Sequence, residues 1–279
     1  MDNGEIMKIA MRQSAYDCCC MEEDFRKKGN SVHVSSVSGE ARKYLKLPHI
    51  CNLVSYGTNI VACGRKELLP EVETFINGVS SISDCFETPE IYVLNDILAK
   101  YDARVCFMAE YFLPDIDLVY GMDISRPYEL RVLEPDDFSG LYLPAWGNAL
   151  CKDRKHLDVL GIGAYEEGKL VGLAGCSADC DAMWQIGVDV LPEHRRRGIA
   201  SALTNRLARE TFARGKVPFY CAAWSNVKSV KNAIRSGFRP GWVEVTARPA
   251  AEVEEMLGRT GQEGQGCDSG IESCQSSDK

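Results

Sequence analysis

The sequence Met183-Trp-Gln-Ile-Gly-Val-Asp-Val-Leu-Pro-Glu-His-Arg-Arg-Arg-Gly-Ile-Ala-Ser-Ala-Leu203 predicts a strand, a tight turn and a helix in succession. Its first part is rich in Ile and Val and is broken at Pro192, which is typical of a short buried strand. Apolar residues then recur at 199, 203 and 207, a helical period. A helix that starts directly after a turn presents unpaired backbone N–H groups at the positive end of its dipole. The stretch therefore predicts an anion site suited to a phosphate or pyrophosphate.

A second stretch has the same order of elements. Val217–Trp224 has the composition of another buried strand, and Ser225-Asn226 is a helix N-cap signal. The short helix that follows ends at Gly237, the position that a C-terminal glycine takes. Two strands, each leading into a helix, are therefore expected in this part of the chain.

These two stretches resemble the signature segments of the GNAT superfamily, the acyl-CoA-dependent N-acyltransferases. The pyrophosphate loop of that superfamily follows an Arg/Gln-x-x-Gly-x-Gly/Ala pattern, which is matched by Arg195, Gly198 and Ala200. Its other segment is similar to Asn226-x-x-Ser229 followed by Gly237-Phe238. The resemblance covers roughly residues 127–248 and implies an α/β (α+β) fold with a mixed, splayed central sheet flanked by helices.

The resemblance also implies where acetyl-CoA, as co-substrate, would bind. The strand before the loop would bind the pantetheine arm, the loop amides would hold the pyrophosphate, and the next helix would begin beside the thiol-bearing end. The two strands 183–190 and 217–224 would splay apart next to the acyl group. The residues that this assigns to binding are Val188, Val190, Arg195, Arg196, Arg197, Gly198, Ile199, Ala200, Ser201, Asn226 and Ser229.

The catalytic residues stay open at this stage. Many members of the superfamily carry a Tyr seven residues after the Asn, where this chain has Ala233, so the usual general acid is absent. Solvent, Ser229 or Tyr220 are the alternatives, or the reaction proceeds without one. A family glutamate often lies where this chain has Trp184 and Gln185. Asp189 and a water relay are further candidates for the general base.

Three parts of the chain are expected. Residues 1–126 form a second, smaller α/β domain of accessory role, residues 127–248 the GNAT domain, and residues 249–279 an acidic, disordered tail. Helices are predicted over 5–16, 67–79 and 90–101, and strands over 32–37, over 53–61 around a turn at 56–59, and over 104–111. In the GNAT domain, 134–138 is expected to cap a helix running towards Cys151, followed by a hairpin over 159–177 and a strand over 183–190. The accessory domain is expected to wall the acceptor pocket or to bind independently.

The cysteines indicate reduced thiols. The chain has 13 of them and no signal-peptide core, which fits buried free thiols better than a disulfide scaffold. Cys18, Cys19 and Cys20 are adjacent, which is poor geometry for one tetrahedral metal, and there is no Cys-x-x-Cys pair. We therefore expect no metal.

Charge and hydropathy exclude other classes of protein. The net charge is −8, of which the tail from Ala250 contributes −5, so the overall charge gives no case for nucleic acid. Arg195-Arg196-Arg197 alone would suit a solvated basic turn or a nucleic-acid patch, but the second segment favours a CoA loop. No apolar run approaches the ~20 residues that span a bilayer, so no membrane partner and a cytoplasmic location are expected.

Three functions remain open. The favoured one is an acetyl-CoA-dependent N-acetyltransferase acting by direct attack in a ternary complex on a primary amine of a small-molecule or amino-acid-like acceptor. The alternatives are an acyl-CoA-binding sensor with little turnover and a peptide or protein N-acetyltransferase. The acceptor, the acyl length and the oligomeric state cannot be deduced from the sequence.

Overall fold

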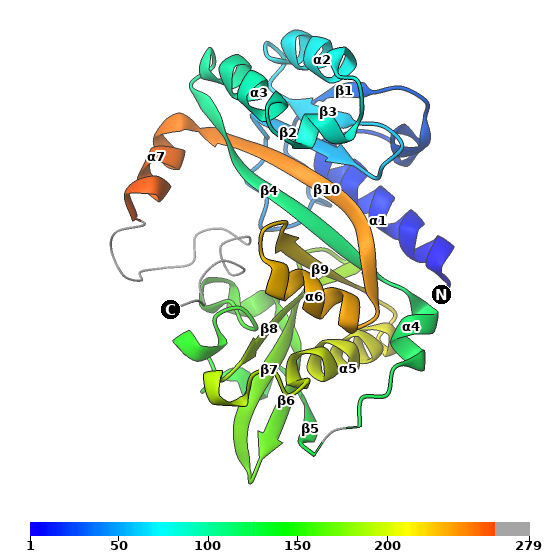
Figure 1. The fold of residues 1–279 in the computed structure, drawn as a ribbon, viewed down its shortest axis with the longest axis vertical. Coiled ribbons are helices and arrows are strands. Elements are labelled where there is room, and N and C mark those ends of the chain that lie inside the picture. Colours follow the sequence, from blue (N-terminus) through cyan, green and yellow to red (C-terminus); the bar gives the residue numbers. More distant parts are fainter. Residues whose placement is uncertain (126, 260–279) are drawn as a thin grey trace. The chain divides into compact units, whose positions relative to one another are not determined.

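The computed structural model describes residues 1–125 and 127–259. It divides the chain into two compact units, one built from residues 1–9 and 111–240 (unit 1) and one from residues 10–110 and 241–259 (unit 2). Two long neighbouring strands, β4 (Ala103–Pro114) and β10 (Phe238–Pro249), each have residues in both units (Figure 1). The units divide at 110/111 and 240/241, whereas the sequence placed its boundaries at 126/127 and 248/249, so residues 127–248 as a separate domain stay a prediction.

Unit 1 contains a mixed sheet in the order β10-β4-β9-β8-β7-β6-β5. Its strands and main helices are α4 (Ile116–Gly121), β5 (Glu129–Leu133), β6 (Asp158–Glu166), β7 (Lys169–Ser177), β8 (Met183–Val190), α5 (Ile199–Ala213), β9 (Val217–Ala223) and α6 (Val227–Arg235). Strands β5 to β8 pair antiparallel, and β8 and β9 pair in parallel. The predicted meander of hairpin and third strand is therefore confirmed.

Two apolar clusters cover opposite faces of this sheet. Ala174 lies in the cluster beneath α5, together with Ile199, Leu203 and Leu207. The next residue towards the chain's start, Leu173, points the other way and packs with Phe138 and Trp146. The apolar stripe at 199, 203 and 207 thus holds α5 against the sheet and fixes the position of its first turn.

The helix predicted from Phe138 towards Cys151 is wrong. This segment forms only short 3-10 turns: η3 (Pro135–Phe138), η4 (Pro144–Trp146) and η5 (Lys152–Leu157). Gly140, Pro144 and Gly147 interrupt it, since Gly disfavours a helix and Pro lacks the N–H that a helix interior needs.

Unit 2 contains a smaller mixed sheet in the order β1-β3-β2-β10-β4. Its other elements are α1 (Asn3–Cys18, which begins in unit 1), η1 (Glu22–Arg26), β1 (Ser31–Val34), β2 (Cys51–Ser55), β3 (Val61–Gly64), α2 (Leu69–Gly78), η2 (Ser83–Phe86), α3 (Glu90–Ala99) and α7 (Ala250–Arg259). The predicted helices and strands of the first 111 residues all have a counterpart here. Its core packs α2 and α3 on the sheet and includes Val245 and Ala247 from β10.

The tail departs from its prediction at its start. Residues 250–259 form α7, whereas disorder was expected from residue 249. Val253 and Met256 are three residues apart and partly buried, and the acidic residues between them are good helix formers. Residues 260–279 lie outside the described residues.

Within the described ranges, no helix combines the length and the apolar character that a bilayer crossing requires. None of the described cysteines is in a disulfide, and most of them are buried.

Candidate active site

The turn between β8 and α5 ends in a helix N-terminus without a side-chain cap. After η6 (Pro192–His194), Gly198 takes the left-handed conformation, with φ +78°, and α5 begins at Ile199. Helical hydrogen bonding starts with the Ala202 N–H, which donates to the Gly198 carbonyl at 3.1 Å. The amides of residues 199–201 therefore have no acceptor within the helix and lie at its positive end. These are the amides to which the sequence assigns an anion site, and that assignment stays a prediction.

The three arginines of the turn differ in their surroundings. Arg195 and Arg196 line a cavity beside the turn, and Arg195 Nε donates to the Val190 carbonyl at 3.0 Å. Arg197 instead donates to both carboxylate oxygens of Glu166 at 2.7 and 3.3 Å, and its guanidinium lies 5.1 Å from the centre of the Tyr128 ring. Its side chain thus ties the turn to the end of β6 and does not line the cavity.

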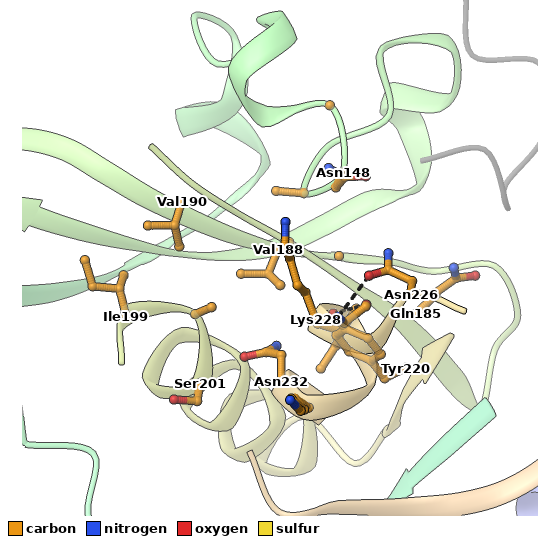
Figure 2. A pocket seen from close by; sticks show the side chains of 18 of the residues that line it. Asn148, Gln185, Val188, Val190, Ile199, Ser201, Tyr220, Asn226, Lys228 and Asn232 are labelled. Atoms are coloured by element: carbon orange, nitrogen blue, oxygen red, sulfur yellow. Dashed lines mark hydrogen bonds between the residues drawn. The ribbon is translucent and has the colours of Figure 1, made fainter. Parts of the chain in front are cut away.

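The cavity has a volume of about 1270 Å³ and lies entirely within unit 1. Figure 2 shows β8 along one side, the first turn of α5 and α6 along another, and the segment around Asn148 opposite them. The residues predicted from the sequence that line it are Val188, Val190, Arg195, Arg196, Gly198, Ile199, Ala200, Ser201, Asn226 and Ser229. All of them come together at one cavity; Arg197 is the exception.

The two parallel strands part in the middle of the cavity wall. β8 and β9 are in register from Met183 opposite Val217 to Ile186 opposite Tyr220, and in the described structure the pairing goes no further. β8 nevertheless continues to Val190 and β9 to Ala223. The edge of β8 that faces away from β7 therefore has no strand partner beyond Ile186. The predicted splay is present.

A pair of hydroxyl groups lies where the strands part. Tyr220 Oη, on β9, is 2.9 Å from Ser229 Oγ, on α6 (Figure 2 labels Tyr220). Asn226 fixes this helix start, because its side-chain oxygen accepts the Ser229 N–H at 3.1 Å. Ala233, at the position of the usual tyrosine, is completely buried in the apolar core. The tyrosine that reaches this cavity therefore comes from the neighbouring strand.

Comparison with known proteins identifies this part of the chain. A family model described as the acetyltransferase (GNAT) family matches residues 127–238. Residues 127–238 thus match the GNAT family, and the rest of the chain lies outside that match. No curated protein matches the chain.

Solved structures of GNAT proteins are similar to part of the chain. A putative acetyltransferase of the GNAT family from Novosphingobium aromaticivorans is 20% identical over 52% of this chain and 66% of its own, with a TM-score of 0.39. A GCN5-related N-acetyltransferase-like protein from Streptococcus suis is 17% identical over 58% of this chain and 69% of its own, with a TM-score of 0.43. An aminoglycoside N-acetyltransferase in complex with CoA is 20% identical over 41% of this chain and 90% of its own, with a TM-score of 0.32. The assignment rests on the family model rather than on these structures.

Asp189 holds a neighbouring segment in place through hydrogen bonds, so its carboxylate is not available as a base. Its carboxylate accepts hydrogen bonds from Asn148 N at 2.8 Å, Asn148 Nδ2 at 2.7 Å and Ala149 N at 3.0 Å. Burial raises the pKa of Asp189, and these three hydrogen bonds oppose the rise. Gly187 allows the same close approach, because a Cβ there would overlap the Asn148 carbonyl oxygen. The segment at 147–149 is thus held directly on β8 as one wall of the cavity.

Of the other residues considered as the general base, one lines the cavity and one does not. Gln185 lines the cavity of the GNAT segment. Trp184 packs against the apolar core, and neither it nor Asp189 is among the residues that line the cavity.

The far end of the GNAT cavity is acidic, which sequence reasoning missed. Asp158 and Asp179 line it and are 3% and 1% exposed, respectively. Asp158 Oδ2 accepts the Cys151 N–H at 3.0 Å, while burial raises the pKa of Asp158 to about 7. Asp179 is 3.4 Å from Arg154 Nη1. Asp158 reaches the cavity because it starts β6 and is in register with Ser177 at the end of β7. This register was the signal that could have placed it there.

Proposed function

We propose that the protein is an acetyl-CoA-dependent N-acetyltransferase that transfers an acetyl group directly to a primary amine of a small-molecule or amino-acid-like acceptor. One observation carries the proposal: the uncapped N-terminus of α5 and the gap between β8 and β9 open into a single cavity. An anion site and an extended unpaired strand edge, joined in this way, suit a long ligand with a pyrophosphate at one end.

The residues of the chain divide the binding between them. The amides of residues 199–201 bind the pyrophosphate, with Arg195 and Arg196 adding positive charge at the same end. Val188 and Val190 bind the pantetheine arm through the open edge of β8. Asn226 and Ser229 lie along the thiol-bearing end, where β8 and β9 part. The thioester carbonyl then lies beside Tyr220.

Two groups handle the protons. An amine must lose a proton to attack, and Asp158 is suited to accept it, because a base with a pKa near the working pH is the most effective. The departing thiolate must gain one, and Tyr220, held by Ser229, donates it. The remaining contribution is positioning the thioester and the amine in near-attack geometry.

The acidic end supports a cationic acceptor. Asp158 and Asp179 line the cavity near the start of β6, whereas Arg195 and Arg196 follow the end of β8. Arg154 pairs with Asp179, which leaves Asp158 to face the acceptor. An amine with a second positive group suits this end better than a carboxylate does, since like charges repel. We infer that the acceptor is a small diamine or a basic amino-acid-like molecule. We further infer that unit 1 of a single chain supplies the whole site and that the protein acts in the cytoplasm.

A thermal-shift titration with acetyl-CoA, CoA and ATP, followed by thiol release with a panel of amines, tests the proposal. A ligand at about 100 times its dissociation constant stabilises by about 2.7 kcal/mol, a shift of roughly 5–10 °C. We expect a shift with both CoA species but not with ATP, and thiol release that depends on a cationic amine. A shift without turnover for any amine or peptide would favour the sensor, turnover with peptides alone would favour a protein acetyltransferase, and no shift would overturn the site.

A further inference from the structure

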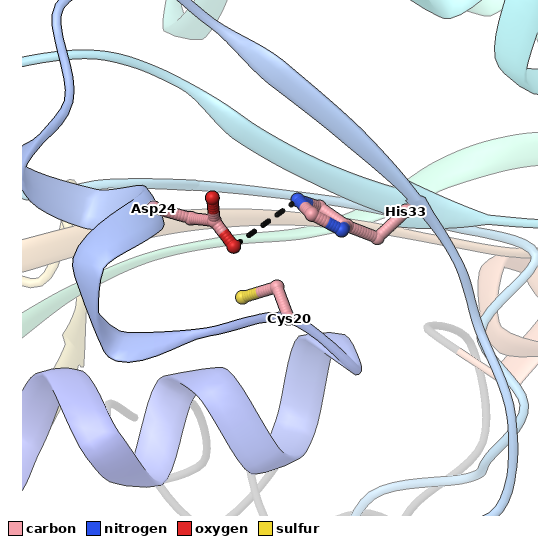
Figure 3. Close-up of side chains that lie close together, drawn as sticks. All are labelled: Cys20, Asp24 and His33. Carbon is pink, nitrogen blue, oxygen red and sulfur yellow. Dashed lines mark ion pairs between the residues drawn. The ribbon is translucent and has the colours of Figure 1, made fainter.

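Three side chains of unit 2 bring metal-binding atoms together, away from the cavity described above. The Cys20 sulfur, an Asp24 carboxylate oxygen and a His33 ring nitrogen all lie within 4.8 Å of one another. Figure 3 shows the three side chains pointing towards a common space from three separate segments of the chain. Among the described residues, this is the one such group of three or more His, Cys, Asp or Glu side chains.

A left-handed turn places Cys20. Helix α1 ends at Cys18, Cys19 has φ +56°, and the Cys20 N–H donates to the Ala15 carbonyl at 3.0 Å. This is the hydrogen bond that closes a helix with a left-handed residue, a position where Gly is usual. A non-glycine residue in this conformation carries strain of about 1 kcal/mol or more. The turn directs Cys20 back towards η1.

Local hydrogen bonds orient Asp24 and His33. Asp24 Oδ2 accepts the Met21 N–H at 2.8 Å, and Oδ1 accepts Lys27 Nζ at 2.6 Å, so both carboxylate oxygens have fixed directions. His33 is carried by β1, and its Nε2 lies 3.1 Å from Ser31 Oγ and 3.7 Å from Asp24 Oδ2. The latter distance is longer than a hydrogen bond, so the two groups face each other across a gap.

We propose that Cys20, Asp24 and His33 bind one Zn²⁺ ion. Thiolate, imidazole and carboxylate are the three ligand types that zinc takes in proteins, and tetrahedral coordination places the ligand atoms about 3.3–3.8 Å apart. The separation of 3.7 Å between Asp24 and His33 meets this value, and the upper bound of 4.8 Å requires a closure of about 1 Å. Two anionic ligands balance the charge of the ion, and a water completes the four positions.

The alternative arrangement, a nucleophile relay, does not fit. A relay needs the cysteine on one ring nitrogen of the histidine and the carboxylate on the other. Here one ring nitrogen of His33 lies within 4.8 Å of both the Cys20 sulfur and an Asp24 carboxylate oxygen. Atoms that converge on one point suit an ion.

An ion at this point would join three segments of the chain. Asp24 also contacts Lys27 Nζ at 2.6 Å, which holds the carboxylate in place. The ion would tie the end of α1 to η1 and β1. Sequence patterns did not predict this group, because the spacing Cys-x₃-Asp-x₈-His joins a helix end, a 3-10 turn and a strand.

Isothermal titration of the chelator-treated full chain with Zn²⁺ tests this site without reference to acetyl transfer. We expect one tight equivalent per chain in the wild type. Cys20→Ser and His33→Ala should each weaken that equivalent by about 10-fold or more, since even the loss of an outer partner of a ligand has such an effect. Cys19→Ser is the matched control, because its sulfur contacts Ser36 rather than the three ligands, and it should bind as the wild type does.

Co²⁺ as a spectroscopic probe covers the case in which other thiols also bind metal. A thiolate-to-cobalt charge-transfer band should appear in the wild type and in Cys19→Ser and be lost in Cys20→Ser. Circular dichroism confirms that each variant is folded. The absence of a tight equivalent in the wild type, or an isotherm and a band unchanged in Cys20→Ser and His33→Ala, would overturn the proposal.

Discussion

At the scale of single residues, Asp158 makes the sharpest prediction. Because burial raises its pKa to about 7, the carboxylate form that can take a proton exists above that pH. We expect kcat/KM to rise with pH through about 7 and then to level off. Asp158→Asn should remove this limb and lower kcat/KM by about 10²–10⁴-fold. Asp153→Asn, an exposed neighbour in η5, is the control, and an unchanged pH profile in Asp158→Asn would exclude Asp158 as the base.

The same carboxyl group affects stability with a defined sign. Its pKa in the folded chain lies above the ~3.9 of an unfolded one, so the folded state holds the proton more tightly. Its contribution to stability is therefore present at low pH and is lost as pH rises from about 4 to 7. The free energy of unfolding from urea denaturation at pH 5 and pH 8 should differ less in Asp158→Asn than in the wild type. An equal difference in both proteins would contradict this assignment.

Tyr220 is expected to act on the leaving group. Tyr220→Phe removes the hydroxyl that contacts Ser229 and retains the ring, so the fold should persist. We expect kcat to fall by about 10²-fold, with little change in the KM for acetyl-CoA. Ser229→Ala leaves the tyrosine hydroxyl in place and should have the smaller effect. A kcat within about 2-fold of the wild type in Tyr220→Phe would mean that solvent protonates the thiolate.

At the scale of elements, the start of α5 can be tested with two glycines. Gly198 and Gly215 both have left-handed φ values, +78° and +73°, but only Gly198 lines the cavity. Val at either position should lower stability by about 1–3 kcal/mol, because L side chains are strained there. Gly198→Val should also abolish CoA binding, whereas Gly215→Val should leave it intact. Equal CoA affinity in the two variants, measured by calorimetry, would remove the pyrophosphate from this turn.

The sequence predicted the elements whose signals are local. Pro192, Gly198, Asn226 and Gly237 each act through their own backbone or side chain, so the two strand-to-helix segments, and with them the sides of the cavity, could be predicted. The part of the cavity around Asp158 could not be predicted, because only the register of β6 and β7 places Asp158 beside Ser177.

Two other features also escaped prediction for physical reasons. The capping pattern at 134–138 is real, since Glu134 N donates to Asp137 at 2.9 Å, but the residues that follow cannot continue a helix. Arg197 was assigned to binding through its loop amide, which stays a prediction, and the position of Glu166 at the end of β6 decides where its side chain lies. Local Gly and Pro residues thus end the helical pattern after Phe138, whereas a partner distant in sequence decides the direction of the Arg197 side chain.

At the scale of the whole chain, the boundary predicted at residue 127 can be tested with fragments. Phe112 of β4 and Val119 of α4 are completely buried in the core of unit 1, and a fragment of residues 127–248 lacks both. Each such loss lowers stability by about 2–5 kcal/mol, against a total of about 5–15 kcal/mol for a domain.

We therefore expect the fragment 127–248 to bind a hydrophobic dye and to lack a cooperative thermal transition. A fragment of residues 111–240 retains Phe112 and Val119 and should be the better folded of the two by near-ultraviolet circular dichroism. A sharp transition for 127–248, equal to that of the full chain, would restore the sequence-based boundary.

Because part of β10 belongs to unit 2, this unit cannot complete its fold until late in translation. The core of this unit needs Val245 and Ala247, and β2, which pairs with β3 on one edge, finds its second partner in residues 243–246. More than 130 residues must be translated after Glu110 before this strand emerges, which takes about 7–26 s at about 5–20 residues per second. During that interval the apolar faces of α2 and α3 lack part of the core that they pack against. We therefore expect the nascent chain to bind a chaperone.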